Sequence, residues 1–494
     1  MNKFLKLAGV VALGMTVVSC SSGGKTTKPS IEKMFIGVQG YEFGPAVQKV
    51  IVKLNTPVKT VDASKATVQT AKVDRTVENV YLSDKLGNKT SKESKYVTLE
   101  LHVDYSDKTY SAVASPFQYN MKIFMNEWAP HYNVSVKGLV AGDTTLSKKA
   151  DTIKNRVMPE VDKFNVKDKF TGTYENPLTK KEEKTTVHYA AYQPKELKGK
   201  AKNPLIIWLN GQGEGGTDTS IELLGNEVTA LARDDIQKQF TAGKQTGTYV
   251  LAVQSPTYWM DEGDGTNGSG AGVSRYTEIL MDTIKAYVKS NPDVDPNRIY
   301  LSGCSNGGYM TMNMAVNYPD YFAALVPNAT AYSYYNFERN ADGTYKKVKD
   351  EQTGQEVPVR TTDLWFDQDK VNAVKGIPIW FIHSADDTTV NPQNYALPLY
   401  KALVDAGASN KWFSYYESVK GTDIKDQSYL GHWSWIYYFN NQASGVQDPE
   451  VIRNAQGTSG FEPSNTTLGG KNKAEVDGRT FDTVFAWLNA QSKN

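Results

Sequence analysis

A serine between two glycines is the residue in this sequence best placed to act as a nucleophile. It lies between the strand expected at 298–301, which contains the apolar run 299–301, and a segment at 308–317, which predicts a helix. A sharp strand-to-helix turn would expose the serine hydroxyl, and glycines two residues to either side would relieve crowding there. Five-residue patterns of this kind are common by chance, and the alternative is a turn with an incidental serine. The strand and helix on either side favour a nucleophile in Gly303-Cys304-Ser305-Asn306-Gly307.

A serine hydroxyl needs a general base, and the chain has five histidines from which to supply one. When a serine occupies such a turn, the acid and then the histidine follow it in the chain, which leaves His383 and His432. His432 follows the strand expected at 412–417 and lies in a segment rich in loop residues. His383 ends the strand expected at 378–382, where it is better placed to hold a turn. We therefore predict His432 as the base, against the alternative of a buried structural histidine.

The acid that orients the histidine is expected where the strand before the histidine's strand ends. Asp386 and Asp387 are the only carboxylates at that point of the sequence. One of them would orient the imidazole and stabilise its charged form, and the other would cap the turn.

An oxyanion formed at the serine needs two N–H donors. The backbone of Asn306 is expected to give one, and that of Gln212, in the glycine-rich loop 210–216, the other. The loop also matches G-x-G-x-x-G, a pattern of phosphate-binding loops. It lacks the lysine of a P-loop, and no acidic residue ends the next strand as a dinucleotide site requires. The glycines therefore favour an oxyanion loop.

The elements that must position these residues alternate between strand and helix after residue 170. Continuous apolar runs predict strands buried on both faces, and amphipathic stretches such as 274–289, with Ser274 as N-cap, predict helices. A final helix is expected to contain Phe481, Val484, Phe485 and Leu488 on one face. This alternation predicts an α/β fold, a mostly parallel sheet flanked by helices, over residues 165–494. The strand runs are 204–209, 249–253, 299–301, 323–326 and 379–382.

Residues 31–162 show a different pattern, with short alternating strands and polar turns. Val97, Leu99 and Leu101 alternate with polar residues, and further strands are expected at 50–52 and 80–82. A separate all-β sandwich domain is therefore predicted before the α/β domain.

The first 20 residues are expected to be a signal peptide rather than part of either domain. Two lysines precede an apolar run at 7–18 that is too short to span a membrane comfortably. Small residues before Cys20 and a polar segment after it resemble a bacterial lipoprotein signal, with Cys20 carrying the lipid; the alternative is an ordinary secretory signal. We expect a linker at 21–30 and a lipid-anchored protein of the bacterial cell envelope, outside the cytoplasm.

Composition excludes several other classes of function. The formal net charge is +1, so nothing indicates a nucleic-acid partner. The chain contains two cysteines, Cys20 and Cys304, so a lipidated protein would have no internal disulfide. The spacings typical of zinc sites are absent, and no metal or organic cofactor is implied. Cys304 is expected to be a small buried packing residue beside the nucleophile.

Together these segments resemble bacterial esterases that carry an Ig-like domain before an α/β-hydrolase domain, a group that also includes predicted peptidases. The resemblance rests on 40–47 (GYEFGPAV), 211–216, 303–308 and 431–435. The spacing His-x-x-x-Asp from His383, followed by Val390, is the one that places an acid above the sheet in related enzymes, so the resemblance favours Asp387. Related sequences more often have histidine at the position of Asn210, which here would support the oxyanion loop differently.

Aromatic residues near the strand ends are candidates for contact with substrate. Trp259 follows one strand, and Trp433, Trp435, Tyr437 and Tyr438 surround the predicted base. They could stack on a phenolic or sugar group, with loop packing as an equal alternative. An inserted hairpin at 331–365 could cover the site as a lid or form a surface flap.

The expected chemistry is hydrolysis of a small-molecule carboxylic ester, an aryl or sugar ester among the options, through an acyl-enzyme on Ser305. A serine peptidase acting on short peptides would use the same residues. A non-catalytic surface protein that binds glycans is a less favoured alternative. The sequence does not indicate an oligomeric state.

Overall fold

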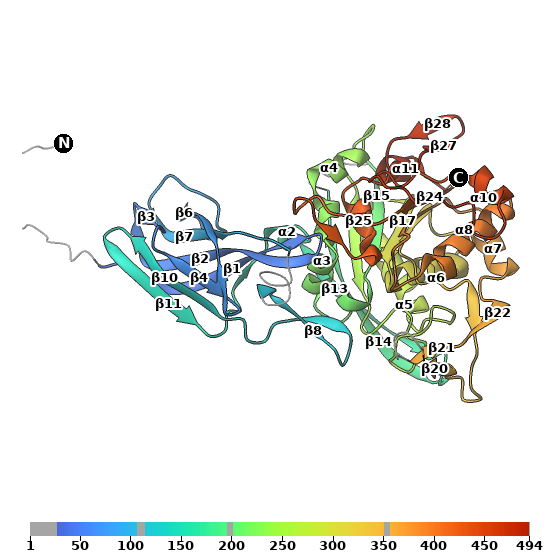
Figure 1. Cartoon of the computed structure of the whole chain (residues 1–494), viewed down its shortest axis with the longest axis horizontal. Coiled ribbons are helices and arrows are strands. Elements are labelled where there is room, and N and C mark those ends of the chain that lie inside the picture. Colours follow the sequence, from blue (N-terminus) through green and yellow to red (C-terminus); the bar gives the residue numbers. More distant parts are fainter. Residues whose placement is uncertain (1–26, 106–113, 195–200, 350–355, 494) are drawn as a thin grey trace, which may run out of the picture.

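The computed structural model describes residues 27–105, 114–194, 201–349 and 356–493. An all-β domain and a larger α/β domain lie side by side along the long axis of the molecule (Figure 1). The first domain uses residues up to Val157 in its sheets, and the sheet of the second begins at Val166. The fold expected from the sequence, an Ig-like sandwich followed by an α/β-hydrolase sheet, is confirmed.

The first domain contains two main sheets. One has the order β12 (Arg156–Val157), β1 (Ile31–Tyr41), β2 (Gly44–Val58), β7 (Ser94–Leu101) and β6 (Val77–Ser83). The other has the order β11 (Thr144–Ala150), β10 (Val134–Ala141), β4 (Thr67–Thr70) and β5 (Val73–Arg75), and β3 (Val61–Asp62) pairs with β10.

The period-2 pattern of the sequence forms the core of this domain. Val50, Val52, Val97 and Leu99 are fully buried between the sheets. Thr98 points to the other face yet is buried too, and its hydroxyl donates to Ser83 Oγ at 2.8 Å. The strand is therefore covered on both faces at this point rather than half-buried.

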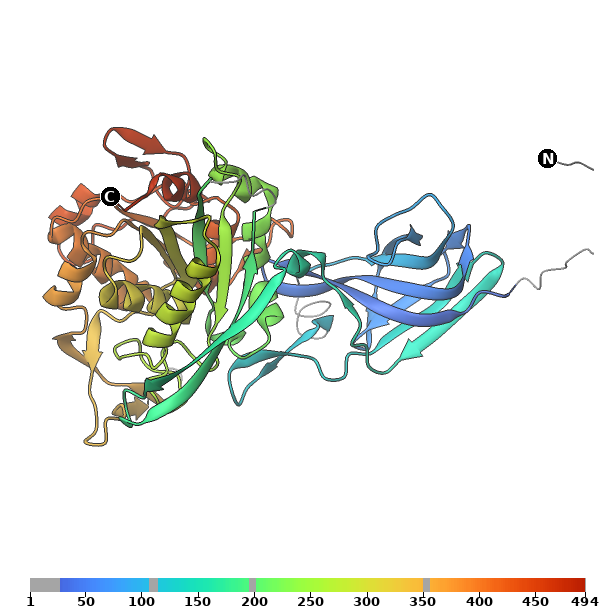
Figure 2. The same ribbon diagram turned by 180° about the vertical axis from the view of Figure 1, so that it is seen from behind.

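A hairpin of the first domain reaches the second domain. It consists of β8 (Phe117–Asn120) and β9 (Met125–Trp128), which pair only with each other. The long strands β1 and β2 also extend to the α/β domain, next to the short helix α2 (Pro159–Asp162) (Figures 1 and 2). The two domains therefore meet through the hairpin, the β1–β2 turn and α2.

The second domain is built on an eight-stranded sheet. The first two pairings, β13–β14 and β14–β16, are antiparallel and the remaining ones are parallel. The carboxyl ends of the parallel strands therefore all lie at the same end of the sheet. Ligands and catalytic groups in folds of this kind lie at that end. The order is β13 (Val166–Glu175), β14 (Glu182–Tyr192), β16 (Tyr249–Gln254), β15 (Asn203–Leu209), β17 (Val294–Cys304), β18 (Ala324–Asn328), β23 (Ile379–Ser384) and β24 (Lys411–Tyr416).

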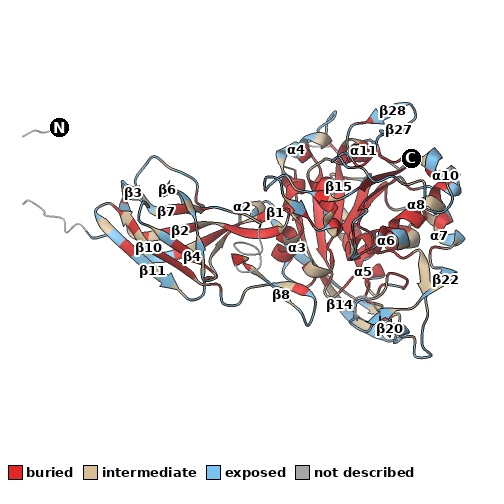
Figure 3. Cartoon of the chain, viewed as in Figure 1, coloured by how far each residue is buried: buried red, intermediate tan, exposed pale blue. Residues whose placement is uncertain are grey.

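Both faces of this sheet are buried, as the continuous apolar runs predict (Figure 3). Leu205, Ile207 and Leu209 pack with the helices of one layer, α5 (Thr277–Ser290), α6 (Asn306–Asn317), α7 (Gln368–Val374), α8 (Ala396–Asp405) and α10 (Pro449–Asn454). Ile206 and Trp208 pack with the other layer, α3 (Thr219–Gly225), α4 (Asp234–Gln237), α9 (Trp435–Phe439) and α11 (Val484–Ala490). None of the helices in the described part of the chain has the length and apolar character needed to cross a membrane.

Two expected element boundaries differ from the structure. Helix α5 begins at Thr277, and Ser274 lies in the preceding turn, where its hydroxyl accepts from Tyr276 N at 3.1 Å. Phe481 belongs to β28 (Arg479–Phe481), which pairs with β27 (Ala474–Val476), and α11 starts only at Val484. In both places a turn stabilised by local hydrogen bonds precedes the helix. The spacing of apolar residues does not reveal such a turn.

Candidate active site

Ser305 lies at a strained turn between β17 and α6. Its φ is 55° and its ψ is −112°, a conformation that L residues rarely adopt. The backbone holds the turn, because Ser305 N donates to Asn328 O at 3.0 Å and Ser305 O accepts from Ala331 N at 3.1 Å. The strand-turn-helix setting predicted for the serine is therefore present.

The glycines around Ser305 are required by close backbone packing. A Cβ on Gly307 would lie 2.0 Å from Leu209 O, and one on Gly303 would lie 2.6 Å from Gly307 O. Side chains at these positions would push α6 away from β15. The expectation that these two glycines relieve crowding around the serine is confirmed.

His432 and Asp387 form a hydrogen-bonded pair near this turn. His432, in the 3-10 helix η5 (Gly431–Trp433), places Nδ1 2.8 Å from Asp387 Oδ2. An ionised carboxylate only accepts, so Nδ1 is the donor and Nε2 is left with a lone pair to take a proton. The edge of Trp435 packs against the imidazole at 5.3 Å between ring centroids.

Asp387 is fully buried and surrounded by donors. Its Oδ1 accepts from Thr389 N at 2.9 Å and Val390 N at 2.8 Å. Burial alone would raise the pKa of Asp387, but the hydrogen bonds and positive charge supplied by His383 and His432 outweigh it and hold that pKa well below its usual range. Asp387 therefore stays ionised wherever the imidazole could act as a base.

The neighbouring Asp386 is exposed and turns away from this pair. Its Oδ1 accepts from Ser384 Oγ at 2.5 Å, a bond that belongs to the turn. Gly431 packs on the same residue, and a Cβ there would lie 2.2 Å from Asp386 Oδ1. Of the two carboxylates left open by the residues alone, Asp387 is the one in contact with His432.

His383 has the turn-holding contacts expected of it. It is fully buried at the end of β23, and its Nε2 lies 2.9 Å from Val390 O and 3.1 Å from Asp387 Oδ2. A carbonyl oxygen can only accept, so Nε2 carries the proton. His383 thus orients Asp387 and the turn that contains it.

The glycine-rich loop after β15 lies beside Ser305. Gln212 begins the 3-10 helix η1 (Gln212–Glu214) and lines the same cavity as Ser305. Asn210 ties this loop to the end of β16: its Nδ2 donates to Gly211 O at 2.7 Å, and its Oδ1 accepts from Ser255 N at 2.9 Å. Asn210 stands where related sequences more often have histidine, and it supports the loop through these buried hydrogen bonds.

Asn267, which was not among the residues expected at the site, connects the two residues expected to supply the oxyanion donors. Its Nδ2 donates to Gln212 Oε1 at 2.8 Å, and its Oδ1 accepts from Asn306 Nδ2 at 2.7 Å. Asn306 is the first residue of α6, where backbone N–H groups have no partner within the helix. An exposed asparagine in a polar loop carries no sequence signal that would identify this link.

Ser305 and His432 line one cavity of about 530 Å³, and residues of the first domain form a large part of its wall. This volume is in the range of small-molecule sites. The residues from the first domain are Glu42, Phe43, Gly44, Pro45, Ser115, Phe117, Tyr119 and Asn126.

The hairpin β8–β9 is fixed to the α/β domain by three hydrogen bonds. Asn126 Nδ2 donates to Glu214 Oε1 at 3.3 Å, and Trp128 Nε1 donates to Ser220 Oγ at 3.1 Å. At the tip, Tyr258 OH donates to Ile123 O at 2.6 Å. The wall that the hairpin forms is therefore anchored at both of its ends.

The turn between β1 and β2 forms the other contribution of the first domain. The buried carboxyl of Glu42 accepts from Thr422 N at 2.8 Å and Thr422 Oγ1 at 2.7 Å. Phe43 packs with Tyr429 at 6.1 Å, and Tyr429 packs with Trp433 at 5.8 Å between centroids. An aromatic cluster thus joins the domain interface to the segment that contains His432.

The structure separates the aromatic candidates. Trp433 and Trp435 line the cavity. The expectation for Trp259 is corrected: its side chain is fully buried, it packs edge-on against Tyr276 at 5.9 Å, and it does not line this cavity. Tyr437 and Tyr438 are buried in the core as well, stacked on Tyr416 and Trp208 respectively.

The insert at 331–365 does not line the cavity within its described residues. Its strands are β19 (Tyr335–Phe337), β20 (Lys347–Lys349), β21 (Glu356–Pro358) and β22 (Arg360–Leu364). Arg339 Nη2 lies 2.8 Å from Glu262 and donates to Ala271 O at 3.1 Å, which fixes the insert to the loop before α5. The described part of the insert is therefore a surface flap and not a lid. The β8–β9 hairpin, and not this insert, lines the cavity.

Buried groups beneath the serine have shifted pKa values. Burial raises the pKa of Glu214 to about 7, so near neutral pH it is protonated for much of the time. Cys304 is fully buried, and burial raises its pKa well above the usual value, so the thiol is unreactive as expected for a packing residue. Among the described residues, no group of three or more His, Cys, Asp or Glu is arranged to bind a metal ion.

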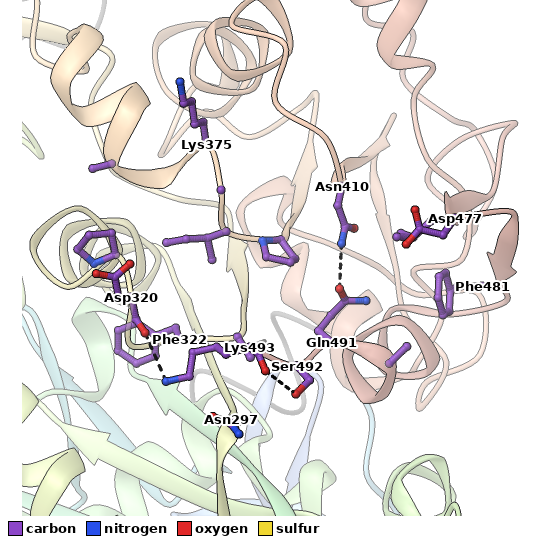
Figure 4. Close-up of a pocket in the computed structure, with 18 of the residues that line it drawn as sticks. Asn297, Asp320, Phe322, Lys375, Asn410, Asp477, Phe481, Gln491, Ser492 and Lys493 are labelled. Atoms are coloured by element: carbon purple, nitrogen blue, oxygen red, sulfur yellow. Dashed lines mark hydrogen bonds between the residues drawn. The ribbon is translucent and has the colours of Figure 1, made fainter.

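A larger cavity of about 1120 Å³ lies at the opposite end of the sheet from Ser305, where β18, β23 and β24 begin (Figure 4). Asn410 Nδ2 donates to Gln491 Oε1 at 2.9 Å across it, and Lys493 Nζ donates to Asp320 O at 3.3 Å. The residues proposed for catalysis all lie at the carboxyl ends of the strands, so this cavity has no part in their chemistry.

Comparison with known proteins agrees with this arrangement. Residues 36–147 match the profile of the esterase Ig-like N-terminal domain, and residues 274–423 match that of the prolyl oligopeptidase family. The fold resembles the crystal structure of a thermostable esterase, with a TM-score of 0.57 and 21% identity over 83% of this chain and 97% of the other.

Two bacterial proteins share shorter stretches of sequence. Poly(3-hydroxyalkanoate) depolymerase C of Paucimonas lemoignei is 41% identical over 71 residues, 14% of this chain and 16% of that protein. Poly(3-hydroxybutyrate) depolymerase of Ralstonia pickettii is 36% identical over 149 residues, 29% of this chain and 28% of that protein. The chain thus aligns with less than a third of either relative.

The fold and the matches define a two-domain protein in which an esterase-type Ig-like domain precedes a domain with the α/β-hydrolase fold. More particularly, residues 36–147 are similar to the esterase Ig-like N-terminal domain, and residues 274–423 are similar to part of the prolyl oligopeptidase family.

Proposed function

We propose that this protein hydrolyses carboxylic esters through an acyl-enzyme formed on Ser305. The observation that carries the proposal is the His432–Asp387 hydrogen bond of 2.8 Å beside a cavity that His432 shares with Ser305. The three residues follow β17, β23 and β24 in the chain order serine, acid, histidine.

In the proposed reaction, His432 Nε2 removes the proton of Ser305 Oγ as the oxygen attacks the ester carbonyl. The backbone N–H groups of Asn306 and Gln212 stabilise the negative charge that develops on the carbonyl oxygen. The protonated imidazole then gives its proton to the departing alcohol, and a water molecule, deprotonated by His432, releases the acid from Ser305.

The cavity wall supports an ester with an apolar or aryl group as substrate. Phe43, Phe117, Tyr119, Trp433 and Trp435 give it an aromatic lining. The names of the two depolymerases suggest aliphatic hydroxyacid esters as one class to test, alongside aryl and sugar esters.

A serine peptidase acting on short peptides is the second candidate, and the match of residues 274–423 to the prolyl oligopeptidase family favours it. The same serine, base and oxyanion donors would serve both reactions. Aryl esters and peptidyl anilides with the same acyl group separate the two, because faster cleavage of the anilide would reverse the preference for esters.

The proposal is tested by Ser305→Ala, which should lower kcat for an aryl ester by at least ~10³-fold. Ser290→Ala is the matched control, because Ser290 is an exposed serine on α5. A fluorophosphonate probe should label the wild type and the control but not Ser305→Ala. Activity that survives Ser305→Ala would rule out this mechanism, and the absence of both turnover and labelling in the wild type would favour a glycan-binding protein.

We further infer, from the sequence alone, that Cys20 carries a lipid and anchors the protein in the cell envelope. Residues 1–26, which include Cys20 and part of the expected linker, lie outside the described residues. Cys20→Ser should move the expressed protein from the detergent phase to the aqueous phase, and unchanged partitioning would contradict the anchor.

A further inference from the structure

The tip of the β8–β9 hairpin exposes a concentration of apolar side chains, of which Tyr119 alone lines the cavity of Ser305. Met121 is 70% exposed, and Tyr119, Ile123 and Phe124 are between 41% and 45% exposed. Of the thirteen large hydrophobic residues exposed among the described residues, four lie within this six-residue segment. We call Tyr119, Met121, Ile123 and Phe124 the hairpin tip.

The hairpin tip is continuous with the cavity of Ser305. Phe117 and Tyr119 point to the same side of β8 by strand alternation, and both line the cavity. Tyr119 pairs with Asn126 across the hairpin, and Asn126 also lines the cavity. An apolar surface therefore runs from the cavity wall along β8 to the tip outside it.

The position of this surface is set by the rest of the molecule. The bonds from Tyr258 to Ile123 and from Asn126 to Glu214 fix the tip to the α/β domain. Met125 is buried against Gly215, where a Cβ would lie 2.7 Å from the methionine methyl carbon. The exposed side chains are thus presented by a fixed hairpin, and contact with a ligand would carry a small ordering cost.

We propose that the hairpin tip binds the aliphatic chain of an ester where that chain extends out of the Ser305 cavity. The inference rests on the proposed function and narrows it to esters with an extended aliphatic chain. A short ester would be contained in the cavity, whereas a longer aliphatic chain that leaves the cavity along β8 would bury its methylenes at the tip, with a gain in affinity for each one.

The charge around the tip favours a single ester chain over a lipid bilayer. Lys122 is the only charged residue between Phe117 and Asn126, whereas surfaces that bind anionic membranes carry clusters of basic residues. The continuity with the cavity of Ser305 is also a feature that a membrane contact does not need.

The test compares p-nitrophenyl acetate with p-nitrophenyl decanoate, each below its solubility limit, for the wild type and Met121→Ser/Phe124→Asn. Phe124 has a φ of 48°, a conformation that asparagine tolerates, so the second substitution preserves the turn. We expect kcat/KM for the decanoate to fall about 10-fold, the free energy of roughly two buried methylene groups. For the acetate it should change less than about 2-fold.

A variant that removes two exposed apolar side chains elsewhere is the control. Val451→Ser/Leu468→Ser replaces residues that are 54% and 49% exposed and do not line the cavity, and it should leave the decanoate-to-acetate ratio unchanged. Equal losses on both esters in the hairpin variant, or no loss on the decanoate, would overturn the proposal. So would unchanged decanoate hydrolysis with lost binding to phospholipid vesicles, which would assign the tip to a membrane. Turnover of the acetate by the wild type tests the proposed function separately.

Discussion

At the scale of single residues, the site depends on one buried carboxylate with four hydrogen-bond donors around it. Two backbone N–H groups bind Asp387 Oδ1, and two imidazoles bind Oδ2. A fully hydrogen-bonded carboxylate cannot rotate to an alternative partner, so it fixes the ring orientation and tautomer of His432.

Exchange of Asp387 for asparagine should lower kcat by about 10²–10⁴-fold, because an amide can present an N–H to Nδ1 and so favour the wrong imidazole tautomer. The neighbouring Asp386→Asn is a matched control, since its side chain bonds Ser384 rather than His432. Steady-state kinetics on an aryl ester would check both, and an equal loss in the two variants would contradict the assignment of the acid.

The residue types predicted most of this site, and the burial of individual side chains decided the rest. Chain order and strand ends reduced the acid to Asp386 or Asp387, and the resemblance to known esterases favoured the second. Only the folded backbone shows that Asp387 points inward. Trp259 was placed wrongly for the same reason: a tryptophan just after a strand can point to the cavity or to the core, and its local sequence is the same in both cases.

At the scale of elements, the loop between β16 and α5 joins three parts of the site. It contains Tyr258, which holds the hairpin tip, and Asn267, which links Gln212 to Asn306. Asn306 also accepts from Met260 N at 3.1 Å, so α6 and the oxyanion loop are braced by the same segment. The loop thus positions both expected oxyanion donors, although none of its residues lines the cavity.

Asn267→Ala should lower kcat about 3- to 10-fold with little change in KM, because donors that lose their support stabilise the oxyanion less well. Asn267→Asp keeps the acceptor for Asn306 and loses the donor to Gln212, so it should fall between the alanine variant and the wild type. Steady-state kcat and KM on a short aryl ester would check this order, and a change confined to KM would contradict a positioning role.

The alternation of strands and helices could be predicted because buried parallel strands have continuous apolar runs. Element ends were less predictable, as the later start of α5 and the strand position of Phe481 show. Both depend on turns whose hydrogen bonds join residues without an apolar signal.

At the scale of the whole molecule, buried acids lie where the two domains meet. Burial, together with the nearby Asp423, raises the pKa of Glu42 to about 7, and burial raises the pKa of Glu227 to about 8. A carboxyl with a raised pKa binds its proton more tightly in the folded than in the unfolded state. The free energy of unfolding should therefore be highest below about pH 4.5 for this contribution and should decrease as the pH rises through about 7.

Glu42→Gln should reduce this pH dependence, because glutamine resembles the protonated side chain and cannot ionise. Thermal unfolding at pH 5.5 and pH 8 should show a smaller loss of stability in the variant, by about 2 kcal/mol. The exposed Glu93→Gln is the control, since Glu93 lies directly before β7 in the first domain. An identical pH dependence in wild type and Glu42→Gln would contradict this effect.

The part of the site least accessible from sequence is the wall supplied by the first domain. Phe43, Phe117 and Tyr119 are far from Ser305 in the chain, and their approach depends on how two folded domains dock. Sequence periodicity describes local structure, so it left the nearer insert at 331–365 as either a lid or a surface flap and gave no signal for the hairpin.

Because the two domains share the cavity, the residues of the proposed reaction and many of the residues that would select the substrate can change independently in evolution. The proposed nucleophile, acid and base are encoded in the α/β domain, and much of the cavity wall is encoded in the all-β domain. Exchange of the hairpin between related proteins could therefore redirect the enzyme to new esters while the reacting groups, and the strained turn beneath them, stay as they are.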